Sequence, residues 1–172
     1  MKKLRLIKTR RAFVRIAVLA LVAGATAQLD SAQPGMDAPA TTRSTILYAA
    51  EPQTVPAGRQ ADLELRFQVL QGFHVNSHTP KSQLLIPTTL SLQPVDGVKA
   101  GAPVYPAGQP YSFPFDPGEK LDVYAGSFIV RLPVVATAGE HTLNATLRYQ
   151  ACDNASCFPP KTLPVKIVFT AK

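Results

Sequence analysis

Cys152 and Cys157 are the only cysteines of the chain, and four residues separate them. The intervening segment, Asp153-Asn154-Ala155-Ser156, consists of residues that favour turns, so a tight β-hairpin is predicted here. Opposed residues of an antiparallel pair have Cα atoms about 4.5 to 5.5 Å apart, a separation that a disulfide accepts. The spacing therefore predicts a Cys152–Cys157 bond that can form and break while the rest of the fold stays in place.

Three kinds of role fit such a pair. As a staple, the bond closes a loop of about six residues and removes only about 2 kcal/mol of unfolded-state entropy, which a domain of this size does not need. A metal needs more ligands than two thiolates, and the spacing of His74, His78 and His141 does not direct them to the cysteines. The short loop keeps both thiols adjacent after reduction, which favours a redox-active pair that needs no cofactor. A static disulfide and a metal site are the alternatives.

The elements that must position the cysteines are β-strands. Apolar and polar residues alternate over 62–69, 142–149 and 163–169, the period of a half-buried strand. Further strands are expected over 73–76, 84–93 and 128–135. No segment has a capped helical period, and 16 prolines suit the edges and loops of sheets. The sequence predicts an all-β fold, an immunoglobulin-like antiparallel β-sandwich of about seven to nine strands.

Residues 101–120 hold five prolines among several aromatic residues. This density of proline predicts a long ordered loop instead of a regular strand. Plain loop packing explains the aromatic residues in the simplest case. The functional alternative is an aromatic cover or a partner-docking surface, because long loops in compact domains are often functional. The aromatic residues are Tyr105, Tyr111, Phe113 and Phe115.

Residues 1–27 have the composition of an export signal peptide: seven basic residues, no acidic residue, an apolar run over 16–23 and a small-residue cleavage site at 25–27. The apolar run is shorter than the roughly 20 residues that span a bilayer, so we expect cleavage after Ala27 and no stable membrane insertion afterwards. Residues 9–15 resemble a twin-arginine motif, and an ordinary basic n-region is the alternative. Both routes predict a periplasmic, bacterial protein.

The remainder of the chain is expected to form a flexible tether over 28–44 and one domain over 45–172. The tether contains almost no large apolar residue and cannot bury a core. Without the seven basic residues of the signal, 11 basic residues stand against 11 acidic ones. The mature protein is therefore near neutral, and its charge gives no support for a nucleic-acid partner.

The cysteine segment resembles a known family. Tyr149-Gln150-Ala151-Cys152, a short polar turn and Cys157-Phe158-Pro159-Pro160 are similar to the periplasmic N-terminal domain of the thiol:disulfide interchange protein DsbD. Residues 73–77 and 121–126 resemble that family as well. The resemblance covers about 45–172, which is nearly the whole mature chain.

The resemblance implies an immunoglobulin-like domain whose cysteine pair exchanges disulfides. Electrons would come from a membrane-embedded donor protein and pass to periplasmic thioredoxin-like or disulfide-isomerase proteins, in a family tied to cytochrome c biogenesis. The chain would then be a thiol-disulfide oxidoreductase with Cys152 and Cys157 as the exchanging pair. The packing surround would be Tyr149, Gln150, Phe158 and Pro159. A covering loop with an aromatic side chain would lie at Asp122, Val123 and Tyr124.

The sequence also departs from the family. Four residues separate the cysteines where about five are expected, which would change the reduction potential. Val123 stands where the covering aromatic residue is expected, leaving Tyr124 or Phe115 for that place. The transmembrane and thioredoxin-like parts are missing from this sequence, so a separate protein would reduce the pair. The competing function is a non-catalytic binding module with a structural hairpin disulfide.

Overall fold

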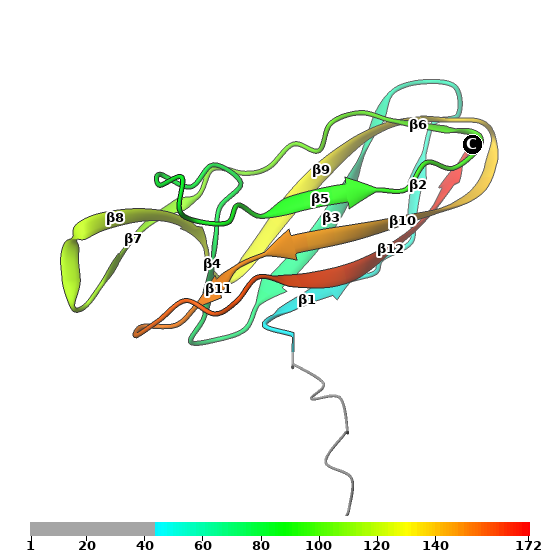
Figure 1. The fold of residues 1–172 in the computed structure, drawn as a ribbon. Helices are drawn as coiled ribbons and strands as arrows, with labels where there is room; N and C mark the ends of the chain where they lie inside the picture. The colour runs from blue at the N-terminus through cyan, green and yellow to red at the C-terminus, as the bar shows by residue number, and fades with distance from the viewer. Residues whose placement is uncertain (1–43) are drawn as a thin grey trace, which may run out of the picture. The chain divides into compact units, whose positions relative to one another are not determined.

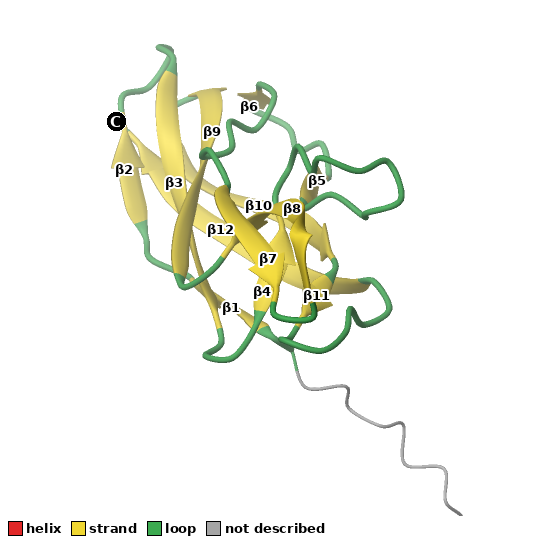
Figure 2. Cartoon of the chain, turned by 90° about the vertical axis from the view of Figure 1, so that its left-hand side faces the viewer, coloured by secondary structure: helices red, strands yellow, loops and turns green. Residues whose placement is uncertain are grey.

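The computed structural model describes residues 44–172, so the expected signal at 1–27 and nearly all of the expected tether lie outside the described residues. The described part contains twelve strands and no helix (Figure 2). The strands are β1 (Ile46–Ala49), β2 (Gln53–Val55), β3 (Ala61–Val69), β4 (His74–Asn76), β5 (Thr89–Leu92), β6 (Val98–Ala100), β7 (Gln109–Phe113), β8 (Asp116–Tyr124), β9 (Ser127–Ala136), β10 (Gly139–Tyr149), β11 (Ala151–Cys152) and β12 (Lys161–Ala171).

The strands form three sheets of four. Two of them, ordered β1-β3-β9-β6 and β2-β12-β10-β5, are the layers of a sandwich, and all their pairings except β2 with β12 are antiparallel. The third, ordered β11-β4-β8-β7, lies at one end of the sandwich, and the β7–β8 hairpin projects from it (Figure 1). We call it the end sheet. The predicted all-β, immunoglobulin-like fold is confirmed, with more strands than expected because β1, β2, β6 and β11 are too short for an alternating pattern to reveal them.

The core lies between the two sandwich sheets. Leu63, Leu65 and Phe67 of β3 are at most 1% exposed, while the polar residues between them face outward. Leu147 of β10 and Ile167 of β12 are buried to the same degree in the same cluster. Fully burying one such side chain contributes roughly 1.5 to 3 kcal/mol, so the strands predicted by alternation are also those that hold the domain together.

The longest hairpin of the fold carries the cysteines at its end. Strands β10 and β12 pair over eleven positions, from Gly139 opposite Ala171 to Tyr149 opposite Lys161. Beyond Tyr149 the chain continues into β11, turns back through Cys157 and re-enters the sandwich as β12. Strand β10, which is anchored in the main core, thus leads directly into the cysteine turn at the end sheet.

The prediction of one long loop over 101–120 is wrong for its second half. Residues 109–113 form β7 and residues from 116 onward form β8, which pair with each other as a hairpin. Pro110 is accommodated because β7 is the outer strand of the end sheet, where a missing N–H breaks no interior ladder. The register shifts between Tyr111 and Phe113, so the pairing is irregular beside the remaining prolines.

Candidate functional site

Cys152 and Cys157 form the predicted disulfide, with their Cα atoms 3.9 Å apart. The two residues are opposite each other in an isolated antiparallel bridge. The positions on both sides of them are hydrogen-bonded: Asp153 N donates to Ser156 O at 2.9 Å and Phe158 N donates to Ala151 O at 2.8 Å. The cysteines therefore occupy a non-hydrogen-bonded position, where opposed residues approach most closely, and their Cα atoms are closer still than the about 4.5 Å usual at such a position.

The turn between the cysteines is held by one side chain. Asp153 Oδ1 accepts hydrogen bonds from the backbone N–H groups of Ala155 and Ser156, both at 2.8 Å. These bonds stabilise the charged form and hold the pKa of the Asp153 carboxyl below its ordinary value. The negative charge beside the disulfide is therefore tied to the geometry of the turn.

The two sulfur-bearing residues differ in their access to solvent. Cys152 is 0% exposed, whereas Cys157 is exposed. Cys152 belongs to a second, smaller buried cluster with Phe113, Leu121 and Val123. Cys157 is therefore the residue of the pair that faces solvent, while apolar side chains enclose Cys152.

The aromatic cover of this cluster comes from β7. Tyr111 packs against the cluster, and its hydroxyl donates a hydrogen bond of 3.0 Å to Asn154 Oδ1, a residue of the cysteine turn. Phe113 is part of the cluster, and Phe115 stacks on Phe113 with ring centroids 4.9 Å apart. The stretch with proline and aromatic residues thus contributes side chains around the disulfide.

The residues of segment 122–124, which was expected to cover the disulfide, do not all face the cysteines. Val123 contacts the cysteine cluster. Tyr124 lies instead in the main core, where its ring stacks on Phe128 at 4.6 Å and its hydroxyl donates to Pro106 O at 3.0 Å. Asp122 is half-buried and accepts a hydrogen bond from Ser77. The rings nearest the cysteine therefore belong to β7, because successive residues of β8 point to opposite faces.

Gln150 fastens the base of the cysteine hairpin. Its side-chain Oε1 accepts hydrogen bonds from Asn76 Nδ2 at 3.0 Å and from Ile86 N at 3.2 Å. Its Nε2 donates to Phe158 O at 3.2 Å. One side-chain amide thus links β4, the segment before β5 and the residue that follows Cys157. Gln150 therefore holds the cysteine hairpin against the end sheet.

The other residues of the expected surround become more exposed to solvent along the chain. Tyr149 is 1% exposed in the main core, and its hydroxyl shares a hydrogen bond of 3.2 Å with Ser44 Oγ. Phe158 is half-buried, with its ring centroid 6.0 Å from that of Phe73. Pro159 is exposed. These residues anchor the hairpin on one side and leave its Cys157 side open.

His74 was not singled out as a site residue by the sequence, yet it lies opposite Cys152 in the pairing of β4 with β11. Its side chain is buried at 3% exposure, with its ring centroid 4.0 Å from that of Tyr111. Its Nε2 is buried and has no hydrogen-bond partner among residues 44–172. Burial lowers the pKa of this imidazole, and the nearby Asp153 carboxylate partly opposes that shift. His74 is therefore a neutral, unpaired base beside the buried cysteine.

The metal-site alternative finds no support in residues 44–172, where no three His, Cys, Asp or Glu side chains gather as metal ligands. His78 stacks on Tyr105 at 3.8 Å, and its Nδ1 is 3.0 Å from Thr88 O. It therefore does not join His74 at the cysteines. The same described residues include no helix with the length and apolarity to cross a membrane.

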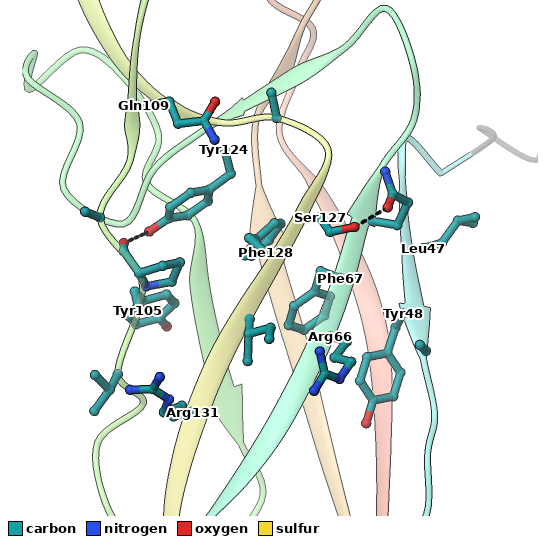
Figure 3. Close-up of a pocket in the computed structure, with 17 residues that line it drawn as sticks. Leu47, Tyr48, Arg66, Phe67, Tyr105, Gln109, Tyr124, Ser127, Phe128 and Arg131 are labelled. Atoms are coloured by element: carbon teal, nitrogen blue, oxygen red, sulfur yellow. Dashed lines mark hydrogen bonds between the residues drawn. The ribbon is translucent and has the colours of Figure 1, made fainter.

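A groove of about 860 Å³ lies away from the disulfide (Figure 3). A row of aromatic rings lines it, including Tyr48, Phe67 and Phe128. Arg66, which also lines the groove, is already paired with Glu64. No cysteine lines this groove, so the sulfur atoms capable of exchange lie at the end sheet and not in the groove.

Residues 46–168 match the sequence model of the family described as thiol:disulfide interchange protein DsbD, N-terminal. The chain belongs to this family. The match covers more than half of the chain and includes both cysteines, and it confirms the resemblance found in the sequence. None of the curated proteins matches the chain significantly.

Three solved structures are similar to this DsbD N-terminal-type chain. The reduced DsbD N-terminal domain of Neisseria meningitidis is 19% identical, with a TM-score of 0.43, over 67% of this chain and 86% of that one. The complex of the Neisseria meningitidis DsbD and PilB N-terminal domains gives 20% identity and a TM-score of 0.42, over 65% and 80%. The N-terminal periplasmic domain of Proteus mirabilis ScsB gives 12% and 0.44, over 71% and 44%.

Proposed function

We propose that this chain is an exported thiol-disulfide exchange protein. It passes electrons through Cys152 and Cys157 from a membrane reductant to extracytoplasmic disulfide proteins. The observation that carries the proposal is the unequal burial of the bonded cysteines, with Cys152 closed off and Cys157 open to another molecule. A disulfide exchange needs one accessible sulfur and one that stays close to resolve the intermediate.

The exchange proceeds in two balanced stages. A thiolate of the reductant attacks Cys157 Sγ, the bond to Cys152 breaks, and Cys152 leaves as a thiolate that takes up a proton. A second thiolate of the reductant then displaces Cys157, so the reductant becomes a disulfide and this chain a dithiol. In the second stage the Cys157 thiolate attacks the disulfide of an acceptor, and Cys152 displaces the acceptor thiolate. Two electrons and two protons pass from donor to acceptor in each cycle.

The surrounding residues have distinct roles in this proposal. Val123, Phe113 and Tyr111 shield Cys152 from unrelated thiols, and Gln150 holds the hairpin so that the released thiols remain adjacent. The loop between the cysteines is short, with a sequence separation of five, and this also keeps the released thiols adjacent. These features limit exchange to partners that can seat a sulfur on the exposed Cys157.

The proposed partners are proteins with exchangeable cysteines. The donor is a membrane-embedded protein, and the acceptors are periplasmic thioredoxin-like or disulfide-isomerase proteins. The solved complex of a DsbD N-terminal domain with the PilB N-terminal domain supports a protein partner for this kind of domain. Membership of the family and the signal-like residues 1–27 support a periplasmic location.

The reduction potential of the Cys152–Cys157 pair tests the proposal. The purified protein is equilibrated with glutathione buffers, trapped with a thiol reagent and analysed by mass. A potential between about −180 and −270 mV, the range of known exchange proteins, is expected. A pair that stays oxidised below about −300 mV would identify a structural bond and favour the binding module. In cells, Cys152→Ser and Cys157→Ser should each change the thiol status of periplasmic proteins.

A further inference from the structure

We propose that His74 accepts and returns the proton of the Cys152 thiol during exchange. The inference rests on the proposed function, because it concerns the resolving step of that reaction. It assigns a reacting role to a residue outside the cysteine hairpin. The role is needed because Cys152 must become a thiolate before it can attack, and an apolar site disfavours the charged thiolate.

The geometry of the end sheet brings the two residues together. Strand β4 pairs with β11 so that His74 is directly opposite Cys152, and the two strands lie side by side in Figure 1. Directly opposed residues of an antiparallel pair have Cβ atoms about 4.5 to 5.5 Å apart on the same face of the sheet. Both side chains also meet the same aromatic residues, since the rings of Tyr111 and Phe113 pack near His74 and against the cluster of Cys152.

With its proton on Nδ1, the neutral imidazole of His74 has an acceptor at Nε2 that lacks a donor. In the described part of the chain, this Nε2 is buried and finds no hydrogen-bond partner while the cysteines are oxidised. A buried polar atom without a partner calls for a specific explanation. The disulfide has no S–H group, whereas reduction creates one on Cys152. That thiol supplies the donor that the oxidised site lacks.

The electrostatic surroundings set the resting charge state of His74. From β11 and its turn, Asp153 faces the imidazole with a negative charge that stabilises its protonated form. From β7, Tyr111 is the titratable neighbour. From β8, the residues at the cluster are the apolar Leu121 and Val123. Burial lowers the pKa of His74 and so keeps it neutral and ready to accept a proton at neutral pH.

In the resolving step the proton moves before the disulfide forms. Cys152 Sγ–H transfers its proton to His74, which forms an imidazolium and a thiolate. The thiolate attacks Cys157 Sγ of the mixed disulfide, the Cys152–Cys157 bond forms, and the partner leaves as a thiolate. The imidazolium returns its proton to solvent or to the departing sulfur. In the reverse direction the same proton meets the Cys152 thiolate as it leaves.

Oxidised glutathione is a suitable probe, because its attack and its resolution can be observed separately. The reduced protein is mixed with oxidised glutathione, quenched with acid at set times, and analysed by mass for the glutathione adduct and the internal disulfide. His74→Phe keeps an aromatic ring against Tyr111 and removes the proton acceptor, and His74→Gln keeps polarity. His141→Phe is the matched control, since His141 stacks on Phe169 in the sandwich.

Both His74 variants should form the adduct within about twofold of the wild-type rate and resolve it about tenfold more slowly or worse. Their resolution rate should also rise only at higher pH, because the buried thiol then ionises without a base. Equal resolution rates and equal pH profiles in wild type and variants would overturn the role of His74 alone. A wild-type protein that forms neither adduct nor internal disulfide would overturn the proposed function together with it.

A spectroscopic measurement serves even if the variants fold poorly. The ¹⁵N resonances of the His74 imidazole are recorded in the oxidised and reduced wild-type protein. Reduction should move the resonance of the unpaired nitrogen, because it then accepts a hydrogen bond from the Cys152 thiol. Resonances that stay in place on reduction would contradict the proposal.

Discussion

Cys152 and Cys157 share one disulfide, yet Cys152 has no exposed surface and Cys157 is open to solvent. The difference arises because β11 is paired with β4 and covered by side chains of β7 and β8, whereas Cys157 has only an isolated bridge to Cys152. The bond therefore has two chemically distinct ends. In the proposed function this difference gives the two cysteines different roles, a choice that the sequence left undecided.

The first prediction concerns trapping of a partner. With Cys152→Ser, the accessible Cys157 still attacks a partner disulfide, but no second thiol resolves the product, so a stable mixed disulfide accumulates. With Cys157→Ser, the remaining thiol is buried, and adduct formation should be at least about tenfold slower. Incubation with oxidised glutathione followed by mass analysis measures both. Faster adduct formation through Cys152 would reverse the assigned roles.

The second prediction concerns the stability of the reduced domain. Because the disulfide closes a loop of only about six residues, its loss should lower the free energy of unfolding by about 2 kcal/mol. Neither cysteine belongs to the main core, so the reduced protein should stay folded and unfold in one transition. Urea denaturation with and without dithiothreitol gives the difference. A reduced protein that is unfolded at neutral pH would mean that the bond is a structural staple.

The sequence predicted best what depends on local alternation. The positions of Leu63, Leu147 and Ile167 in the core follow from a period of two, and the disulfide follows from the turn residues between the cysteines. The β7–β8 hairpin could not be predicted in this way, because Pro110 is acceptable only on an outer strand and the sequence does not say which strand is outermost.

The position of His74 opposite Cys152 could not be predicted from the sequence, for a related reason. It depends on the register between β4 and β11, which have three and two residues and are more than seventy positions apart in the chain. No periodicity develops over so few residues. The sequence also could not predict which residue covers Cys152. The choice between Val123 and Tyr124 depends on which face of β8 is turned toward the cysteine cluster.

The third prediction concerns pH. The folded-state pKa of Asp153 lies below its unfolded value of about 3.9, because Ala155 and Ser156 donate hydrogen bonds to the carboxylate. The stabilisation of the turn is therefore present above that unfolded value and is lost as pH falls through the folded pKa. NMR titration of the Asp153 carboxyl carbon should give a midpoint below the ordinary one. An ordinary or raised midpoint would mean that these hydrogen bonds do not hold in solution.

The fourth prediction concerns docking of a protein partner. Phe115 is 67% exposed and stacks on Phe113, which connects it to the cluster around Cys152. Phe115→Ser should slow exchange with a folded thioredoxin-like protein about tenfold, since an exposed aromatic anchor can carry more than 1 kcal/mol of binding energy. Exchange with glutathione should not change. Leu47→Ser is the control, because Leu47 is 53% exposed and lines the groove of Figure 3. Equal losses in both variants would argue against docking at Phe115.

The fifth prediction concerns the place of Asp122 in the end sheet. A Cβ atom at Gly108 would overlap the Asp122 carboxylate, which is held by the Ser77 hydroxyl. Gly108→Ala should therefore push Asp122 away from Ser77 and lower the free energy of unfolding by about 1 to 3 kcal/mol. Gly118→Ala is the matched control, since a Cβ there makes only an ordinary contact with Asp116.

A double-mutant cycle decides whether the Gly108 effect acts through Asp122. Asp122→Ala removes the carboxylate, so Gly108→Ala should cost clearly less in that background than in the wild type. The four unfolding free energies come from urea denaturation of the oxidised proteins. Additive losses would show that the strain at Gly108 is relieved elsewhere, for example by movement of the 101–108 backbone. A coupled result would instead identify Gly108 as the residue that lets β8 approach Ser77, and through this contact sets the position of Val123 against Cys152.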